Sequence, residues 1–99
     1  MSISIGDIYW LKIKSDIKHP HVIVGINNDD SVLVCSITTN TKKFNMPKTI
    51  VLEAGEGNLQ RQSIVEAYKI YTVQTKELSE YIGTLENSSI RKINSVWRL

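Results

Sequence analysis

The sequence has one cysteine, two prolines and five glycines in 99 residues, and each scarcity excludes a class of protein. The single thiol, Cys35, cannot form an internal disulfide, so we expect a reducing, cytoplasmic setting. The low Gly and Pro content excludes collagen-like and low-complexity chains. No apolar run approaches the ~20 residues of a membrane span, and the N-terminus lacks the basic start and apolar stretch of a secretion signal.

What is present fits an ordinary globular protein, with 41% hydrophobic and 22% charged residues. A chain of this length supports one hydrophobic core, because chains divide into separate cores only at two to three times the length. We therefore expect a single domain over residues 1–99, with no interdomain linker and no internal repeat.

The net charge of +2 is unevenly distributed. Residues 1–50 hold six lysines against four aspartates, whereas residues 51–99 hold six basic against six acidic residues. The excess in the first half favours an anionic partner, although a solvated surface explains the same lysines. These lysines are Lys12, Lys14, Lys18, Lys42, Lys43 and Lys48.

The first two thirds of the chain predict short strands separated by turns. Side chains alternate over 8–13, and 21–26 is rich in β-branched residues, which pack well on a pleated surface. Asn27-Asn28-Asp29-Asp30 predicts a turn, so 21–26 and 31–39 should form a hairpin. We also expect loops over 14–20, 40–47 and 53–58, a short apolar segment over 49–52, a long strand over 62–73 and a brief final strand over 83–85.

The end of the chain predicts helical structure. Residues 75–81 fit one or two turns with Thr75 as N-cap, and either Asn87 or Ser88 caps a terminal helix. The apolar face of this helix is formed by Ile90, Ile93, Val96 and Trp97. Several short strands and a terminal helix predict a mainly β, α+β fold, in which the helix packs on a small, strongly bent sheet or barrel.

Taken singly, the chemical motifs are weak. His19 and His21 lie two apart in an extended segment and should share one face, but zinc needs two further ligands, so we expect no metal site. Gly55-Glu56-Gly57 does not introduce a helix and lacks the Lys-Ser/Thr pair of a phosphate loop. No Gly-x-Ser-x-Gly turn of a hydrolase is present. Cys35 lies mid-strand among apolar neighbours and is expected in the core.

Polar residues at strand ends form a more informative set. In a small barrel such ends converge at one rim, and a rim with histidine, hydroxyl, amide and arginine groups suits a phosphodiester. RNA carries its own nucleophile, the 2′-hydroxyl, so this rim would need neither metal nor covalent residue. Alternatively, the hydroxyls and amides only cap turns. The set comprises His19, Ser36, Thr38, Asn40, Arg61, Gln62 and Ser63.

The order of these segments resembles the MazF/PemK toxins of toxin–antitoxin modules, over nearly the whole chain. The resemblance is carried by Gly6-Asp7-Ile8-Tyr9-Trp10, His19-Pro20-His21-Val22-Ile23-Val24, Val32-Leu33-Val34-Cys35-Ser36-Ile37-Thr38-Thr39-Asn40, Leu52-Glu53-Ala54-Gly55-Glu56-Gly57-Asn58-Leu59, Gln62-Ser63-Ile64-Val65 and Ile82-Gly83-Thr84-Leu85. It implies an SH3-like β-barrel of five to seven short strands with a C-terminal helix, usually a homodimer.

The resemblance also implies an activity and partners. The activity is that of a metal-independent endoribonuclease without a cofactor, which cleaves single-stranded RNA at short sequences by 2′-hydroxyl attack. The protein partner is an antitoxin with an acidic tail. DNA would be reached only indirectly, through the antitoxin. The implied catalytic residues are His19, Thr38 and Arg61, and the residues expected to bind substrate are His21, Ser36, Asn40, Lys42, Lys43, Gln62 and Ser63.

Two positions depart from the family pattern. Most members have Arg-Pro where this chain has His19-Pro20, so His19 would act as an acid or base rather than as a fixed charge. An acidic residue usual in the family is replaced at Tyr68-Lys69, and Glu66, two residues earlier, is not assumed to substitute. These departures leave a second hypothesis open: a catalytically impaired module that binds RNA or a protein target, as in the related toxins that poison DNA gyrase.

Overall fold

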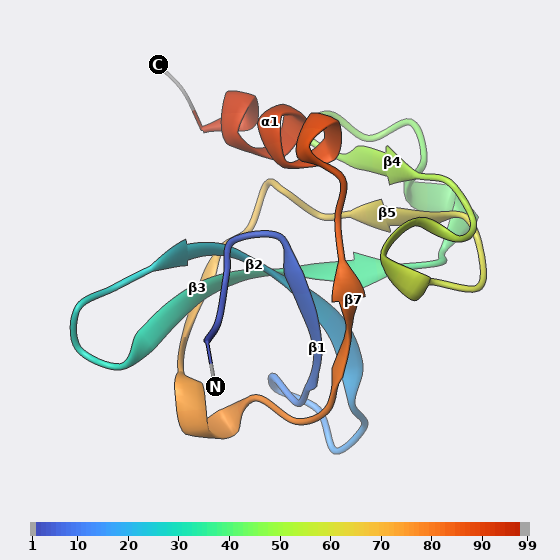
Figure 1. The fold of residues 1–99 in the computed structure, drawn as a ribbon. Coiled ribbons are helices and arrows are strands. Elements are labelled where there is room, and N and C mark those ends of the chain that lie inside the picture. The colour runs from blue at the N-terminus through green and yellow to red at the C-terminus, as the bar shows by residue number, and fades with distance from the viewer. Residues whose placement is uncertain (1, 98–99) are drawn as a thin grey trace.

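The computed structural model describes residues 2–97, which form seven strands and one α-helix (Figure 1). Every strand pair is antiparallel, and the sheet has the order β4-β5-β3-β2-β1-β7, with β6 also paired to β3. The elements are β1 (Asp7–Leu11), β2 (His19–Ile26), β3 (Ser31–Thr38), β4 (Ile50–Leu52), β5 (Ser63–Val65), β6 (Tyr71–Gln74), β7 (Tyr81–Thr84) and α1 (Asn87–Val96).

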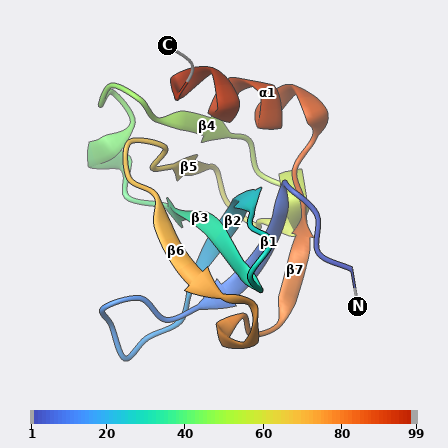
Figure 2. The same ribbon diagram turned by 90° about the vertical axis from the view of Figure 1, so that its left-hand side faces the viewer.

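The sheet curls into a half-barrel around β3, as Figures 1 and 2 show. One end of β3 pairs with β6 and the other with β5, so β3 joins the two parts of the sheet. Helix α1 lies over β4 and β5 in both views. The expected bent β fold with a packed terminal helix is confirmed, with seven strands in a half-barrel. No helix in the described part of the chain is long and apolar enough to span a membrane.

The hairpin of β2 and β3 is the centre of the fold, and the expected turn joins its strands. The turn closes with a hydrogen bond from the Asn27 amide to the Ser31 carbonyl at 3.0 Å, and Asp30 takes a positive φ of 62°. Asp tolerates this left-handed conformation because its short side chain bonds locally. Both faces of β3 are covered, because the curled sheet encloses one and α1 with β4 and β5 cover the other.

Cys35 lies fully buried in the core beside Ile8, Val22 and Leu52, as expected. Burial raises the pKa of this thiol to about 11, and the negative charge of Glu66 acts in the same direction. The thiol therefore behaves as a small apolar side chain at neutral pH.

The expected long strand over 62–73 is wrong. It is two strands, β5 and β6, separated by 66–70, where the chain turns with a hydrogen bond from the Lys69 amide to the Glu66 carbonyl at 3.3 Å. The alternation continues through the small, buried Ala67, so the sequence gives no sign of the break. The interruption matters because it places Glu66 and Tyr68 beside β3.

Smaller expectations also need correction. β1 ends at Leu11, and β2 begins at His19, because Pro20 pairs with Trp10 inside the sheet instead of lying in the loop. A single 3₁₀ turn, Thr75–Glu77, replaces the expected helix over 75–81, and its N-cap is Gln74, whose side chain forms a capping box with Glu77.

The terminal helix forms where expected but begins one or two residues earlier. Its N-cap is Glu86, in place of Asn87 or Ser88. Ile90, Ile93 and Val96 pack against the core, but Trp97 is 45% exposed, because the helix ends at Val96 and Trp97 leaves the apolar face.

Gly83 lies directly against the backbone of Gly57. A Cβ atom at this position would overlap the carbonyl group of Gly57, which cannot rotate away as a side chain can. We expect Gly83→Ala to lower the free energy of unfolding by roughly 3 kcal/mol, measured by denaturant titration. Gly25→Ala is the matched control, because its nearest neighbour is a flexible Leu33 methyl at 2.8 Å, and its loss should be smaller. Equal losses would contradict this account.

Candidate functional site

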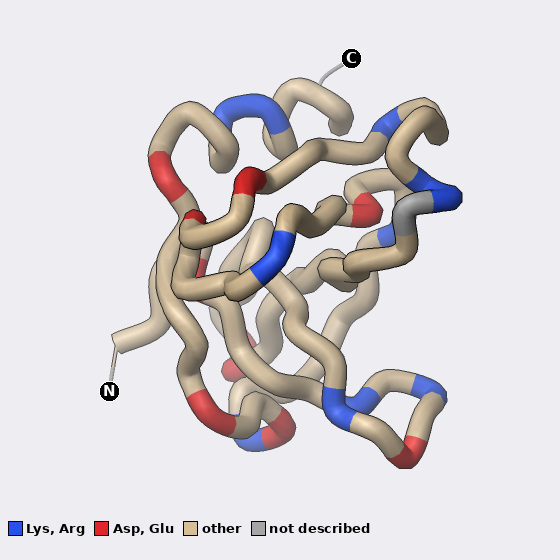
Figure 3. The backbone as a smooth tube through the Cα atoms, turned by 90° about the vertical axis from the view of Figure 1, so that its right-hand side faces the viewer, with Lys and Arg blue, Asp and Glu red and all other residues tan. Residues whose placement is uncertain are grey.

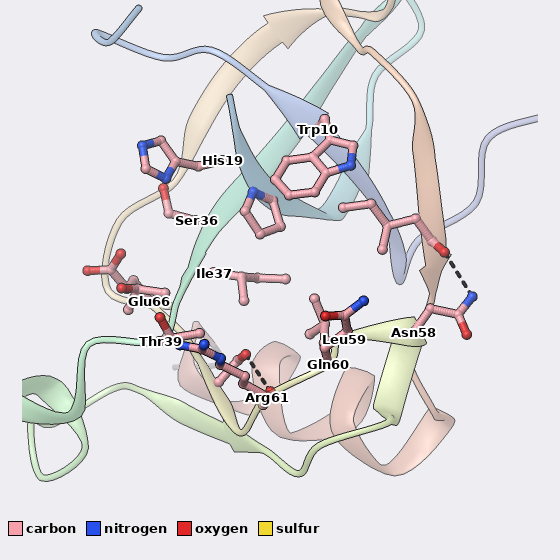
Figure 4. A pocket seen from close by; sticks show the side chains of 14 residues that line it. Trp10, His19, Ser36, Ile37, Thr39, Asn58, Leu59, Gln60, Arg61 and Glu66 are labelled. Carbon is pink, nitrogen blue, oxygen red and sulfur yellow. Dashed lines mark hydrogen bonds between the residues drawn. The ribbon is translucent and has the colours of Figure 1, made fainter. Parts of the chain in front are cut away.

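A pocket of about 660 Å³ opens where β2, β3 and the approach to β5 meet (Figure 4). It receives the three residues implied as catalytic, His19, Thr38 and Arg61, and two of those expected to bind substrate, Ser36 and Ser63. Strands that are far apart in the sequence therefore do converge at one place.

His19 reaches the pocket because it is the first residue of β2, opposite Leu11 of β1. The side chain is exposed, and no hydrogen bond to its ring is found within residues 2–97. The ring is consequently open to solvent and to a ligand in the pocket. The register also puts His19 and His21 on the same face, as expected.

Thr38 is held at the end of β3 by the turn that follows it. Its hydroxyl oxygen accepts the Asn40 amide at 3.1 Å, and the Asn40 side-chain oxygen accepts the Lys42 amide at 3.0 Å. Asn40 thus shapes the loop here, in line with the turn-capping alternative. Neither Asn40 nor Lys42 lines the pocket, so a role in substrate binding stays a prediction for both.

Arg61 enters from the segment before β5. The Ser63 hydroxyl is buried and donates to the Arg61 carbonyl at 2.9 Å, which fixes the backbone that presents the arginine. Of the residues that the structure describes, none forms an ion pair with its guanidinium. Gln62 points elsewhere and donates to the Glu53 carboxylate at 3.2 Å.

His21 is buried behind Ser36 and does not line the pocket. Its Nε2 atom lies 3.1 Å from the Ser36 hydroxyl, and its Nδ1 atom lies 2.9 Å from the His19 carbonyl oxygen. Burial is the main influence on His21 and lowers its pKa below 6.5, since water no longer solvates the imidazolium.

Glu66 lines the pocket and also faces a second pocket of about 230 Å³ beside it, together with Lys43, Tyr68 and Ser36. Lys43 forms an ion pair with Glu66 at 2.7 Å, and the Tyr68 hydroxyl donates to the same oxygen at 2.5 Å. Burial opposes ionisation of Glu66, but these two donors outweigh it, and its pKa falls below 4.5. The positive charge of Lys43, expected to contact substrate, is therefore largely compensated.

Trp10 and Glu66 are among the pocket residues that were not predicted from the sequence, as are Thr39, Asn58 and Gln60. Trp10 is 37% exposed across the pocket from His19. The alternation of β1 places Trp10 on one face with Lys12, and an indole beside a lysine signals a wet surface. Glu66 carries no such signal, because its approach to Ser36 depends on the unexpected break after β5.

The basic residues lie where the sequence suggested. Figure 3 shows basic segments on the two loops along one side of the molecule, with a further basic segment between them. The exposed lysines of these loops flank the strand ends that form the pocket. This distribution favours an anionic ligand along that side.

The Glu66–Lys43 pair predicts a dependence of stability on pH. Because the pKa of Glu66 is lowered in the folded state, its contribution is complete above pH 4.5 and is lost as pH falls through the lowered value. We expect Glu66→Gln to cost about 1 kcal/mol of unfolding free energy at pH 7. In denaturant titrations, the difference in unfolding free energy between the wild type and Glu66→Gln should become smaller below pH 4.5. A difference that stays constant with pH would contradict the role of the ion pair.

The fold and the pocket together define a class: a small antiparallel β half-barrel that presents histidine, arginine and hydroxyl groups at converging strand ends. The family follows from the sequence. Residues 4–99 match the PemK-like, MazF-like toxins of type II toxin–antitoxin systems, and the chain belongs to this family. No curated protein matches the chain.

Solved structures agree with the fold. An endoribonuclease in complex with its cognate antitoxin from Mycobacterial species has a TM-score of 0.81 at 21% identity, over 96% of this chain and 90% of that one. An endoribonuclease from Mycobacterial species gives 0.77 at 22% identity, over 97% and 88%. The toxin MazF-mt6 of Mycobacterium tuberculosis gives 0.75 at 21% identity, over 91% and 90%.

Proposed function

We propose that this toxin is an endoribonuclease that cleaves single-stranded RNA within short sequences, without a metal ion. The observation that carries the proposal is the gathering of His19, Thr38 and Arg61 around one open pocket. Family membership and the similarity to two solved endoribonuclease structures support the same substrate. The RNA 2′-hydroxyl attacks the adjacent phosphorus and leaves a 2′,3′-cyclic phosphate and a free 5′-hydroxyl.

Each of the three residues has a distinct part. The Arg61 guanidinium neutralises charge on the phosphoryl oxygens as the pentavalent transition state forms. The His19 ring gives an N–H proton to the leaving 5′-oxygen, the general-acid step that histidine side chains most often perform. The Thr38 hydroxyl donates a hydrogen bond to a phosphoryl oxygen and fixes its orientation.

The biological unit extends beyond one chain. We propose that residues 1–99 form a single domain, that two copies form a homodimer, and that a cognate antitoxin covers the pocket in the cytoplasm. The antitoxin complex of a similar structure supports the last partner. Contact with DNA is indirect, through the antitoxin.

The test incubates the purified wild-type protein with a random pool of single-stranded RNA in EDTA. We expect cleavage after a short shared sequence, with 2′,3′-cyclic phosphate and 5′-hydroxyl ends identified by end-specific ligation. A His19→Ala/Arg61→Ala double variant, purified in parallel, controls for contaminating nuclease.

Other outcomes would overturn the proposal in distinguishable ways. RNA that is bound but intact, with affinity falling steeply as salt rises, would indicate an RNA-binding module. Growth arrest on expression with intact cellular RNA would indicate a protein target.

A further inference from the structure

The proposed reaction needs a base for the 2′-hydroxyl proton, and a chain of hydrogen bonds beside the pocket fits that need. Ser36 lines the pocket, while His21 does not line it and is only 3% exposed. Figure 4 shows Ser36 between His19 and Glu66, on the wall opposite Trp10. His21 therefore meets the pocket through Ser36.

The geometry fixes the tautomer of His21. A carbonyl oxygen only accepts hydrogen bonds, so the contact from Nδ1 to the His19 carbonyl at 2.9 Å requires the proton on Nδ1. In the neutral ring Nε2 then carries the lone pair. The Ser36 hydroxyl, 3.1 Å away, donates to that lone pair, and Ser36 also lines the pocket.

The surroundings keep His21 in its proton-accepting form. Burial lowers its pKa, and the nearby His19 ring acts in the same direction, while the hydrogen bond to the His19 carbonyl and the charge of Glu66 oppose them. Tyr9 faces His21 from β1, and its own pKa is raised above 10, so it stays uncharged. At pH 7 the His21 ring is neutral and ready to accept a proton.

We propose that Ser36 and His21 form the proton relay that activates the RNA 2′-hydroxyl, an inference that rests on the proposed endoribonuclease activity. Ser36 Oγ takes the 2′-hydroxyl proton as its own proton passes to His21 Nε2. The 2′-oxygen–phosphorus bond forms, the phosphorus–5′-oxygen bond breaks, and His19 protonates the 5′-oxygen. Ser36 ends as a hydroxyl and His21 as an imidazolium, which returns its proton to solvent through Ser36.

Glu66 is the competing base, and its contacts argue against it. One of its oxygens already accepts from both Lys43 and Tyr68, and these donors hold the carboxylate ionised with a lowered pKa. A carboxylate stabilised in this way is a weaker proton acceptor than a neutral imidazole. Glu66 instead supplies charge close to His21.

The first experiment replaces Ser36 and measures single-turnover cleavage of a short RNA that carries the sequence found with the random pool. Ser36→Ala should lower the rate at least ~10²-fold, the size of a lost acid–base group. Ser36→Thr keeps the hydroxyl and should stay within ~10-fold of wild type. Equal rates for Ser36→Ala and wild type would overturn the relay, as would equal losses in both variants while thermal unfolding stays unchanged.

The second experiment uses the pH profile, which a merely structural hydrogen bond would not move. The wild-type rate should fall below pH 6.5, as His21 becomes protonated and can no longer accept. Glu66→Gln removes a charge that raises the pKa of His21, so this acidic limb should move to lower pH. A plateau rate reduced ~10²-fold by Glu66→Gln would make Glu66 the base and overturn the relay.

Failure of the relay is distinct from failure of the proposed function. If the wild-type protein leaves all RNA intact in EDTA, the proposed metal-independent cleavage itself is refuted. If the wild-type protein cleaves RNA and Ser36→Ala cleaves equally well, only the relay is refuted.

Discussion

Replacing Arg61 with alanine is expected to lower the rate of RNA cleavage ~10²–10³-fold, the usual cost of removing one group that stabilises transition-state charge. The guanidinium lines the pocket, and it has no ion-pair partner in the part of the chain that the structure describes. Its full charge is consequently available to the phosphoryl oxygens. The measurement is single-turnover cleavage of a short RNA at saturating protein.

Two control variants separate this effect from a general loss of positive charge. Arg91→Ala removes the same side chain from the exposed surface of α1, away from the pocket, and should cleave RNA at the wild-type rate. Arg61→Lys keeps the charge but loses the planar fork that binds two phosphoryl oxygens at once. It should recover part of the lost rate.

Loss of the fold is not expected to explain the Arg61 result. The Arg61 side chain is exposed, so the thermal unfolding of the Arg61→Ala variant should match that of the wild type. If Arg61→Ala and Arg91→Ala cleave equally well, Arg61 has no special part in the reaction.

The central hairpin was predictable because its signals are local. β-branched residues favour strands, the Asn-Asn-Asp-Asp run supplies a turn, and alternation sets the faces. The break within 62–73 was not predictable. It arises because one end of β3 pairs with β5 and the other end pairs with β6, so the chain must leave the sheet between these two strands. Tertiary curvature here overrides a continuous alternating pattern.

The candidate site also has a part that was predictable from the sequence and a part that was not. His19, Thr38 and Arg61 lie at strand ends, and strand ends of a small curled sheet converge wherever the register falls, so their meeting could be expected. The contacts of His21 and Glu66 depend on register and on the 66–70 turn. To predict the pairing of His21 with Ser36, one must know which residues of β2 and β3 lie opposite each other, and the sequence does not give this register.

Replacing His19 with alanine is the second large effect, an expected ~10²-fold loss in cleavage rate. The ring is exposed at the first position of β2 and faces the pocket, where it can protonate the leaving 5′-oxygen. The measurement is the single-turnover rate from pH 5 to pH 9.

His19→Arg decides whether the position supplies a proton or only a charge. The family resemblance implies arginine at this position, and arginine stays protonated throughout the pH range. If His19 donates a proton, His19→Arg should cleave as poorly as His19→Ala for a 5′-hydroxyl leaving group. It should recover when the 5′-oxygen is replaced by sulfur, which leaves without protonation. Full activity of His19→Arg on ordinary RNA would show that charge alone suffices and would assign the proton donor elsewhere in the pocket.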